Sequence, residues 1–382
     1  MSSDMFIIEE STRQTGARIV AVGVGGGGGN MIGHMINEGV SGIELVVANT
    51  DAQVLDSSLA NTKIQLGGKL TKGLGAGMKP SIGKDSALES YDELRMSLDG
   101  ADIVFIAAGL GGGTGTGAAP IVAQIAKEIG ALTIAVVTKP FKFEGNKRRK
   151  LAEKGLEDLK NECDSIVVIP NDKLLSIIDK RLGLRESFKI VDSVLAQAVS
   201  GTSGVILSHG DNDINLDFAD LQTVMCHRGM ALMGVGEHQG ENAAYEAIKS
   251  AIESPLLDNM SINGAMGVLV HFHIHPDFPM MELTEAMEVV HESADEEADV
   301  IFGTTTDESM PVDSIRITLV ATGFEKELNQ GVNNDDFISE TPAQVQPAMT
   351  QQQATLRPKM VVGGDISDDY LDVPTYMRQQ KD

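Results

Sequence analysis

Two loops rich in glycine follow strand-like stretches in the first third of the chain. The first is VGVGGGGGN (22–30) and the second is GLGGGTGTG (109–117). Glycines let several backbone N–H groups point into one concavity, and a following helix adds the positive end of its dipole. Thr114 and Thr116 can donate hydroxyls to phosphate oxygens or to a metal-bound water. Two such loops at one edge of a sheet predict a site for a phosphate chain held between them.

The first loop also matches the dinucleotide-binding fingerprint G-x-G-x-x-G. Gly23, Gly25 and Gly28 fill its glycine positions, and Asp51 follows about twenty residues further on. Two alternatives therefore stay open, a tight turn without a ligand and an NAD-dependent oxidoreductase that uses Gly23–Gly28. A single dinucleotide site needs only one such loop, so the presence of two favours a longer phosphate chain.

A nucleoside triphosphate has such a chain, but the sequence contains no Walker-type loop. The pattern G-x-x-x-x-G-K-[ST] is absent. The nearest Gly-Lys pair, Gly83–Lys84, is followed by Asp85 and lacks the upstream glycine. The second loop would then hold phosphate through backbone amides and threonine hydroxyls, without a lysine.

The first 180 residues alternate strand-like and helix-like stretches. Short apolar runs predict strands at 17–23, 42–51, 101–109, 131–140 and 164–172, with helices between them that include 115–130 and 145–161. This alternation is typical of βαβ units and predicts a parallel sheet covered on both faces. The apolar positions of 185–207 keep a helical period, so this stretch predicts a long helix that connects two domains.

The remainder of the chain divides into a second, smaller domain and a tail. Between 217 and 322 the pattern predicts helices at 218–227, 241–253 and 282–293 and strands near 230–236, 265–275, 299–304 and 314–322. The stretch after Gly323 is rich in Gln, Asn and Pro, which predicts a disordered linker. An apolar cluster in the last residues is a candidate partner-binding motif, with a frayed terminus as the alternative.

Composition narrows the classes of function. The chain has 382 residues and a net charge of −25, which argues against sequence-independent binding to nucleic acid or to an anionic membrane surface. Cys163 and Cys226 fit neither a disulfide framework nor metal-ligand spacing, as expected in a reducing cytoplasm. The first residues do not fit a signal peptide, and no apolar run approaches the roughly 20 residues of a membrane helix.

Three histidines alternate along one predicted strand. His271, His273 and His275 would share one face of it, and three imidazoles on one face can bind zinc. No fourth ligand is evident, so the preferred interpretation is a solvated strand face, and no metal site is assigned to protein side chains.

Several motifs, in order along the chain, carry a resemblance. GGGTGTG (111–117) resembles the signature loop of the tubulin/FtsZ superfamily of GTPases. Further motifs are similar to the bacterial FtsZ family within it: VGVGGGGGN (22–30), NTD (49–51), TKGLGAG (71–77), VVTKPFKFEG (136–145), PNDKLL (170–175), LDFAD (216–220) and DYLDVPTYMR (369–378). The resemblance implies a cell-division GTPase that polymerises head to tail into the bacterial division ring.

A guanine-binding pair is compatible with the residues themselves. Phe188 and Asp192 lie at i and i+4 of the predicted long helix and share one face. A ring can stack on a base, and a carboxylate can accept from the two adjacent donors that guanine offers. A core phenylalanine and a solvated aspartate are the alternative. Ser193 departs from the family, in which the next position is often acidic or an amide.

The resemblance also assigns residues to nucleotide binding. Glu144 and Arg148, which alone would indicate a surface helix pair, contact the ribose and the nucleotide, Asn171 contacts the sugar, and Thr138 and 75–77 lie near the γ-phosphate. The GTP-binding residues expected from the loops and the resemblance together are Gly26, Gly27, Gly28, Gly29, Asn30, Asp51, Ala76, Gly77, Gly111, Gly112, Gly113, Thr114, Gly115, Thr116, Gly117, Thr138, Glu144, Arg148, Asn171, Phe188 and Asp192.

The hydrolytic groups are expected elsewhere in the chain. Asn215, Asp217 and Asp220 can orient an attacking water, and the two aspartates, at i and i+3, can face one direction. The alternative is that they only cap a helix, which stabilises it by about 1 kcal/mol. A scaffold that binds nucleotide without hydrolysis therefore stays a third possibility. By resemblance these residues act in trans, at the next subunit's nucleotide.

The expected organisation and partners complete the hypothesis. The fold is α/β, with a flexible N-terminal segment (1–13), a Rossmann-like parallel-sheet GTPase domain (14–183), a central helix (184–207), a smaller α/β C-terminal domain (208–323), a disordered linker (324–364) and a partner-binding peptide (365–382). The peptide's binding residues are Asp369, Tyr370, Leu371, Val373, Pro374, Tyr376 and Met377.

The resemblance implies the ligands, the partners and the place of action. It implies GTP or GDP with Mg²⁺, and K⁺ is a further candidate. The partners are other copies of this chain and, through the terminal peptide, membrane-tethering and regulatory division proteins, without nucleic acid and without direct membrane insertion. The place of action is the cytoplasm, at the mid-cell division ring on the inner face of the membrane.

Overall fold

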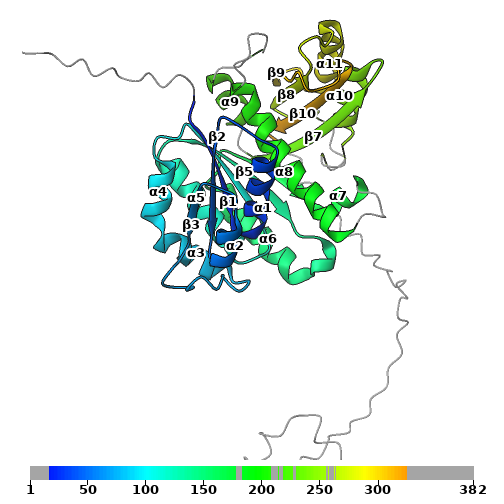
Figure 1. The fold of residues 1–382 in the computed structure, drawn as a ribbon. Coiled ribbons are helices and arrows are strands. Elements are labelled where there is room, and N and C mark those ends of the chain that lie inside the picture. Colours follow the sequence, from blue (N-terminus) through cyan, green and yellow to red (C-terminus); the bar gives the residue numbers. More distant parts are fainter. Residues whose placement is uncertain are drawn as a thin grey trace, which may run out of the picture. The chain divides into compact units, whose positions relative to one another are not determined.

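The computed structural model describes residues 17–177, 183–207, 214, 218–226, 229–254, 257, 262 and 264–324. The predicted N-terminal segment (1–13), nearly all of the linker (324–364) and the terminal peptide (365–382) lie outside these residues. The described chain forms one ten-stranded sheet with helices on both faces (Figure 1).

Six parallel strands form the N-terminal part of the sheet, in the order β3–β2–β1–β4–β5–β6. Their bounds are β1 Ile19–Val24, β2 Ile43–Asn49, β3 Thr62–Gln65, β4 Ile103–Gly109, β5 Leu132–Lys139 and β6 Ser165–Pro170. The winding reverses between β1 and β4, as in a Rossmann-like sheet. The five strands predicted in this region are confirmed, and β3 is an addition to them.

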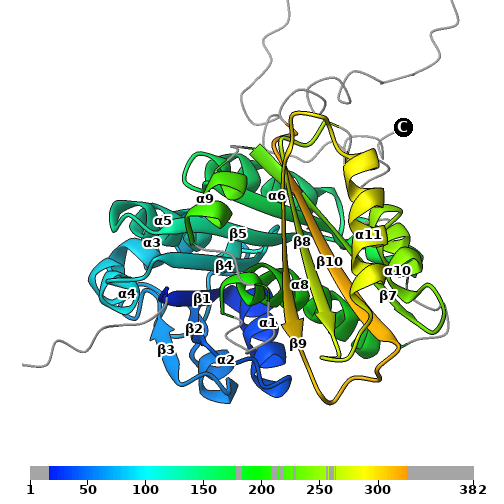
Figure 2. The ribbon, with the colours of Figure 1, turned by 90° about the horizontal axis from the view of Figure 1, so that it is seen from above.

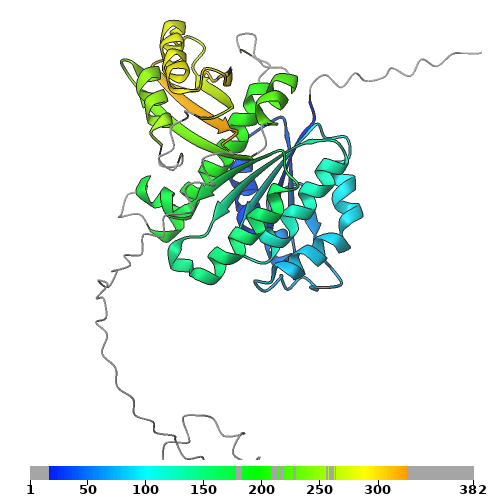
Figure 3. The ribbon, with the colours of Figure 1, turned by 180° about the vertical axis from the view of Figure 1, so that it is seen from behind.

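Two helical layers cover these strands. The helices are α1 Gly25–Asn37, α2 Ala52–Ser57, α3 Pro80–Glu89, α4 Tyr91–Leu98, α5 Thr114–Glu128, η1 Lys142–Glu144, α6 Asn146–Lys160, α7 Asn171–Ile177 and α8 Leu184–Leu207. Ile19 and Ala21 of β1 share a core with α1 and α8, whereas Val20 and Val22 share one with α4, α5 and α6, on the side seen in Figure 3. Because both faces are covered, central strands such as β1 and β4 are apolar at consecutive positions.

The C-terminal part of the chain extends the same sheet. Its elements are α9 Phe218–Met225, β7 Gly229–Gln239, α10 Ala243–Ile252, β8 Gly267–Ile274, α11 Met280–Ser293, β9 Asp299–Thr306 and β10 Ser314–Thr322. β7 pairs with β6 in parallel over three residues, and β10 lies antiparallel between β7 and β8. The predicted elements of the second domain are confirmed, but its strands continue the first sheet and do not form a separate one.

The long helix α8 confirms the predicted central helix and contacts both parts of the chain. Val191 and Leu195 lie in the core beneath the parallel strands. Further along, a Cβ atom at Gly201 would lie only 2.8 Å from Cγ2 of Thr318 on β10, so glycine allows the helix to approach the C-terminal strands closely. In Figure 2, α8 lies on one face of β8 and β10 while α10 and α11 cover the other.

Close contact between α1 and β4 gives a prediction for stability. A Cβ atom at Gly28 would lie 2.2 Å from the carbonyl oxygen of Ala107, whereas one at Gly33, on the same helix, has no neighbour within 4 Å. We expect Gly28→Ala to lower the free energy of unfolding by roughly 1–3 kcal/mol through overpacking. The control Gly33→Ala should raise it by about 0.5–1 kcal/mol, because alanine favours helix. Urea unfolding measures both, and equal effects would contradict the role of the contact.

Candidate functional site

A cavity of about 370 Å³ lies at the carboxyl ends of β1 and β4, where the winding of the sheet reverses. Ligands of open α/β sheets bind at such a point. Predicted residues that line it are Gly26, Gly27, Asn30, Gly112, Gly113, Thr114, Gly115, Thr138, Glu144, Arg148, Asn171 and Asp192. Five further residues line it that were not among the expected GTP-binding residues: Gly109, Leu110, Pro140, Val191 and Leu195.

A second, smaller cavity adjoins the first. It measures about 230 Å³ and shares the lining residues Gly26, Gly113 and Thr114 with its neighbour. Its remaining lining is Asn49, Thr50, Asp51, Val54, Gly75, Ala76, Gly77 and Met78. The structure thus brings the predicted residues Asp51, Ala76 and Gly77 to the far end of the site.

The glycines of the two loops serve different purposes. Gly26 and Gly112 have open space where a Cβ atom would lie, so their backbone is accessible from the cavity. A Cβ atom at Gly113 would lie 2.8 Å from the Ala76 side chain, so this glycine lets the 71–78 loop approach. The first turns of α1 and α5 contain no acidic residue, and both helices begin at the cavity. Their partial positive charge and bare amides form a site for an anion.

Glu144 and Arg148 form an ion pair at the side of the cavity. The alternative interpretation, a surface pair on one helix, is wrong, because Gly145, with φ of +95°, separates η1 from α6. Oε1 of Glu144 also accepts the Phe141 N–H at 2.9 Å. The pair is therefore fixed before any ligand binds.

Asn171 provides evidence that the cavity receives a polar ligand. The residue is 6% exposed and lines the cavity, and its Oδ1 atom has no hydrogen-bond partner among the described residues. A buried acceptor without a partner is costly, and a donor on a ligand would satisfy it. A sugar hydroxyl is such a donor.

Asp192 lines the larger cavity and not the smaller one, to which the 71–78 loop contributes. Burial raises the pKa of its carboxyl from 3.8 to about 6, because little solvent remains to stabilise the charge. A bound group with two adjacent N–H donors would replace the lost solvent and favour the carboxylate. Phe188 lies one turn earlier in α8, where the structure describes the helix but not this side chain.

Other predicted residues do not line either cavity. Thr116 is 3% exposed, and its hydroxyl accepts the Gly111 N–H at 2.9 Å, so its oxygen is engaged within the loop. Those that the structure places outside both linings are Gly28, Gly29, Gly111, Thr116 and Gly117. Asp220 is exposed in the first turn of α9, and Asn215 and Asp217 lie outside the described residues.

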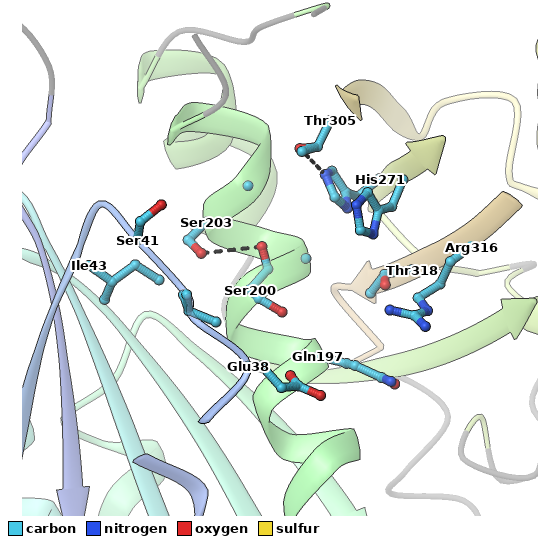
Figure 4. A pocket seen from close by; sticks show the side chains of 14 residues that line it. Glu38, Ser41, Ile43, Gln197, Ser200, Ser203, His271, Thr305, Arg316 and Thr318 are labelled. Atoms are coloured by element: carbon cyan, nitrogen blue, oxygen red, sulfur yellow. Dashed lines mark hydrogen bonds between the residues drawn. The ribbon is translucent and has the colours of Figure 1, made fainter. Parts of the chain in front are cut away.

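His271 and His273 of β8, and His275 directly after it, have separate neighbours and do not converge. His271 contacts Thr305 at 2.8 Å, in a pocket between α8 and the C-terminal strands (Figure 4). His273 lies 3.5 Å from Asp307, and His275 lies 3.7 Å from Asp277. Within the described ranges, no group of three or more potential ligands could hold a metal ion.

Comparison with known proteins decides the family. A model of the Tubulin/FtsZ family GTPase domain matches residues 18–179, and a model of the FtsZ family C-terminal domain matches 229–325. The chain belongs to the FtsZ family. Cell division protein FtsZ of Helicobacter pylori is 46% identical over 96% of this chain and 93% of its own, and that of Coxiella burnetii is 45% identical over 99% and 92%.

Solved structures agree with the fold. An FtsZ structure from M. jannaschii, described as an empty dimer, is 46% identical, with a TM-score of 0.78 over 82% of this chain and 90% of that one. CetZ2 from Haloferax volcanii, described as a GTPgS-bound protofilament, has a TM-score of 0.68 at 21% identity over 81% and 94%, which shows the shared fold.

FtsZ-family membership establishes the general activity. The chain is a cell-division protein with a tubulin-like GTPase domain that binds and hydrolyses GTP. The alternative of an NAD-dependent oxidoreductase has no support, and the glycines of its fingerprint are explained by packing, since a Cβ atom at Gly23 would lie 2.4 Å from the carbonyl oxygen of Gly28. No helix in the described part of the chain is long and apolar enough to cross a membrane.

Proposed function

We propose that the chain binds GTP with its base at Asp192, its ribose at Asn171 and its phosphates between the two glycine loops. The positions of these groups around the two adjoining cavities support this order of base, ribose and phosphates. The terminal phosphate then lies in the smaller cavity, beside Asp51 and the 71–78 loop. The side chain of Phe188 completes the base site in this proposal.

We propose that hydrolysis occurs where two copies meet head to tail, with Asn215, Asp217 and Asp220 supplied by the next copy. The observation that supports this proposal is that the carboxylates lining the two cavities already have partners or other roles. Asp51 Oδ1 accepts the N–H groups of Gln53 and Val54, and Glu144 is paired with Arg148. Asp192 lines the larger cavity, and the remaining oxygen of Asp51, Oδ2, is assigned below to Mg²⁺, so in this proposal no described lining carboxylate is left to orient a water at the terminal phosphate.

The surface around the phosphate end supports a contact with another copy. Leu74 is 85% exposed, and Val54 and Met78, which line the smaller cavity, are 36% and 40% exposed. Apolar side chains in this number at the mouth of a polar site are typical of an interface. A head-to-tail contact is heterologous, so it builds an open filament when its rotation does not close.

Mg²⁺ is proposed as the resident metal because the smaller cavity offers oxygen groups, which this ion prefers. Asp51 and Asn49 are the residues that would hold it, and it would neutralise charge on the phosphates. K⁺ stays a candidate without an assigned residue. The protein's own contribution is to align the phosphates with the amides of α1 and α5.

Concentration dependence tests the shared site. We expect GTP turnover per subunit to rise from near zero as the protein concentration increases, because an isolated copy has only half of the site. Phosphate release and light scattering should be followed together, with GDP as the control that gives no phosphate. Turnover per subunit that is independent of concentration would contradict the proposal, and scattering with GTP but without phosphate would support a non-hydrolysing scaffold.

We further propose that the terminal peptide, through Tyr370, Leu371 and its neighbours, binds membrane-tethering and regulatory division proteins. This would bring an acidic chain to the division ring at the cytoplasmic face of the membrane. Removing 365–382 should leave polymerisation in solution unchanged and abolish recruitment to the ring in cells, and a truncated chain that is still recruited would contradict this role. The six parts predicted from 1–13 to 365–382 stay the proposed domain organisation.

A further inference from the structure

We infer that Thr50 is a positioning residue that turns the Thr114 hydroxyl into a hydrogen-bond donor for the terminal phosphate. The Oγ1 atoms of Thr50 and Thr114 lie 2.6 Å apart, the separation of a short hydrogen bond between hydroxyls. Thr50 follows β2 and Thr114 begins α5, so the contact joins two loops that are distant in sequence. The inference rests on the proposed binding of GTP and assigns a residue to the recognition of its terminal phosphate.

Burial determines which threonine donates. Thr50 borders the smaller cavity but is completely buried, and Thr114 is the one described residue that forms a hydrogen bond with its hydroxyl. A hydroxyl carries one proton and two acceptor sites, and a buried proton without an acceptor is costly. Thr50 therefore donates to Thr114. The Thr114 proton is then left for a different acceptor.

The position of Thr114 identifies that acceptor. Thr114 lines both cavities, at the N-terminal end of α5, and is only half-buried. The base end of the larger cavity is marked by Asp192, so the smaller cavity receives the phosphate furthest from the base. A phosphate oxygen there accepts the Thr114 proton, and the terminal phosphate of GTP occupies a place that GDP leaves empty.

The backbone of Thr50 connects the same residue to the loop on the other side of the smaller cavity. Its carbonyl oxygen accepts the Gly75 N–H at 3.1 Å and the Thr71 hydroxyl at 3.3 Å. Lys72 and Met78 of this loop have φ of +53° and +59°, a conformation that L residues rarely adopt. Thr50 thus contacts Thr114 through its hydroxyl and the strained 71–78 loop through its carbonyl oxygen.

Nucleotide selectivity tests this role. We expect Thr50→Val, which keeps the shape and removes the hydroxyl, to weaken GTP binding about tenfold and to leave GDP binding within twofold. A factor of ten corresponds to about 1.4 kcal/mol, the worth of one such hydrogen bond. Thr50→Ser should bind GTP like the unchanged chain. The matched control is Thr133→Val, which removes an equally buried hydroxyl of β5 that donates to the carbonyl oxygen of Ala131, directly before the strand.

A double-variant cycle with Thr114→Val separates orientation from packing. If Thr50 acts through Thr114, Thr50→Val adds no further loss once Thr114 lacks its hydroxyl. Equal losses for GTP and GDP, a loss in Thr50→Ser, or additive effects in the cycle would each overturn the inference. An unchanged chain that binds no GTP would instead refute the proposed function before Thr50 is tested.

Discussion

Replacing Asp192 with asparagine removes guanine-nucleotide binding and makes the nucleotide-free protein more stable at neutral pH. Binding falls roughly 100-fold or more, because the amide presents N–H donors to the donors of the base and leaves buried groups unpaired. Competition with a fluorescent guanine nucleotide measures the loss. The control is Glu186→Gln, which neutralises an exposed carboxylate of the same helix. An Asp192→Asn chain that binds GTP within a few-fold of normal would contradict the base-reading role.

The gain in stability follows from the sign of the pKa shift. Burial raises the pKa of folded Asp192 from 3.8 to about 6, so the folded state holds this proton more tightly than the unfolded state does. The charged carboxylate therefore destabilises the fold progressively as pH rises from about 4 to 6, and fully above that range. We expect the stability difference between variant and unchanged chain to grow over that interval and then level off, at roughly 1–2 kcal/mol after discounting for partial exposure. A gap that stays constant from pH 4 to 7 would contradict the shift.

Local sequence was sufficient to find the strands of the parallel sheet and the loops at their ends. Each of the five predicted strands contains a short apolar run, because both faces of the sheet are covered, and glycine marks the turn into α1 and α5. β3 was missed because only Ile64 of its four residues is buried. The joining of β6 to β7 rests on three residue pairs between distant segments, for which no local pattern exists.

Side-chain roles within the site were harder to read from sequence. Thr114 and Thr116 are equivalent by spacing, yet only Thr114 faces the cavities, since the start of α5 turns Thr116 towards Gly111. No sequence pattern predicted a role for Thr50. Its hydrogen-bond partner Thr114 lies 64 residues away, and the acidic position of the dinucleotide-binding fingerprint was assigned to the adjacent Asp51. No sequence pattern apart from the resemblance indicated a role for Asn171. That its Oδ1 atom is buried without a hydrogen-bond partner depends on the residues packed around it, which the sequence does not reveal.

Two inactive variants restore GTP hydrolysis when they are mixed, if the site is shared between copies. Asp217→Ala keeps a complete nucleotide cavity and lacks the proposed carboxylate, whereas Asp192→Asn lacks the base site and keeps Asp217. Each alone should hydrolyse GTP at about 1% of the normal rate or less, a loss that corresponds to removing one essential group. Asp217→Ala should still bind GTP with normal affinity, because the proposal places Asp217 in the neighbouring copy's site.

Random copolymerisation sets the expected recovery. In an equal mixture, an active contact needs an Asp217→Ala copy as the nucleotide holder and an Asp192→Asn copy as the next in line, which gives about a quarter of all contacts. Turnover of the mixture should therefore approach a quarter of normal. The control replaces Asp192→Asn with the double variant Asp192→Asn/Asp217→Ala, which supplies the same surface without the carboxylate and should restore nothing. No recovery in the first mixture, or equal recovery in both, would mean that Asp217 serves its own copy's nucleotide or has no catalytic role.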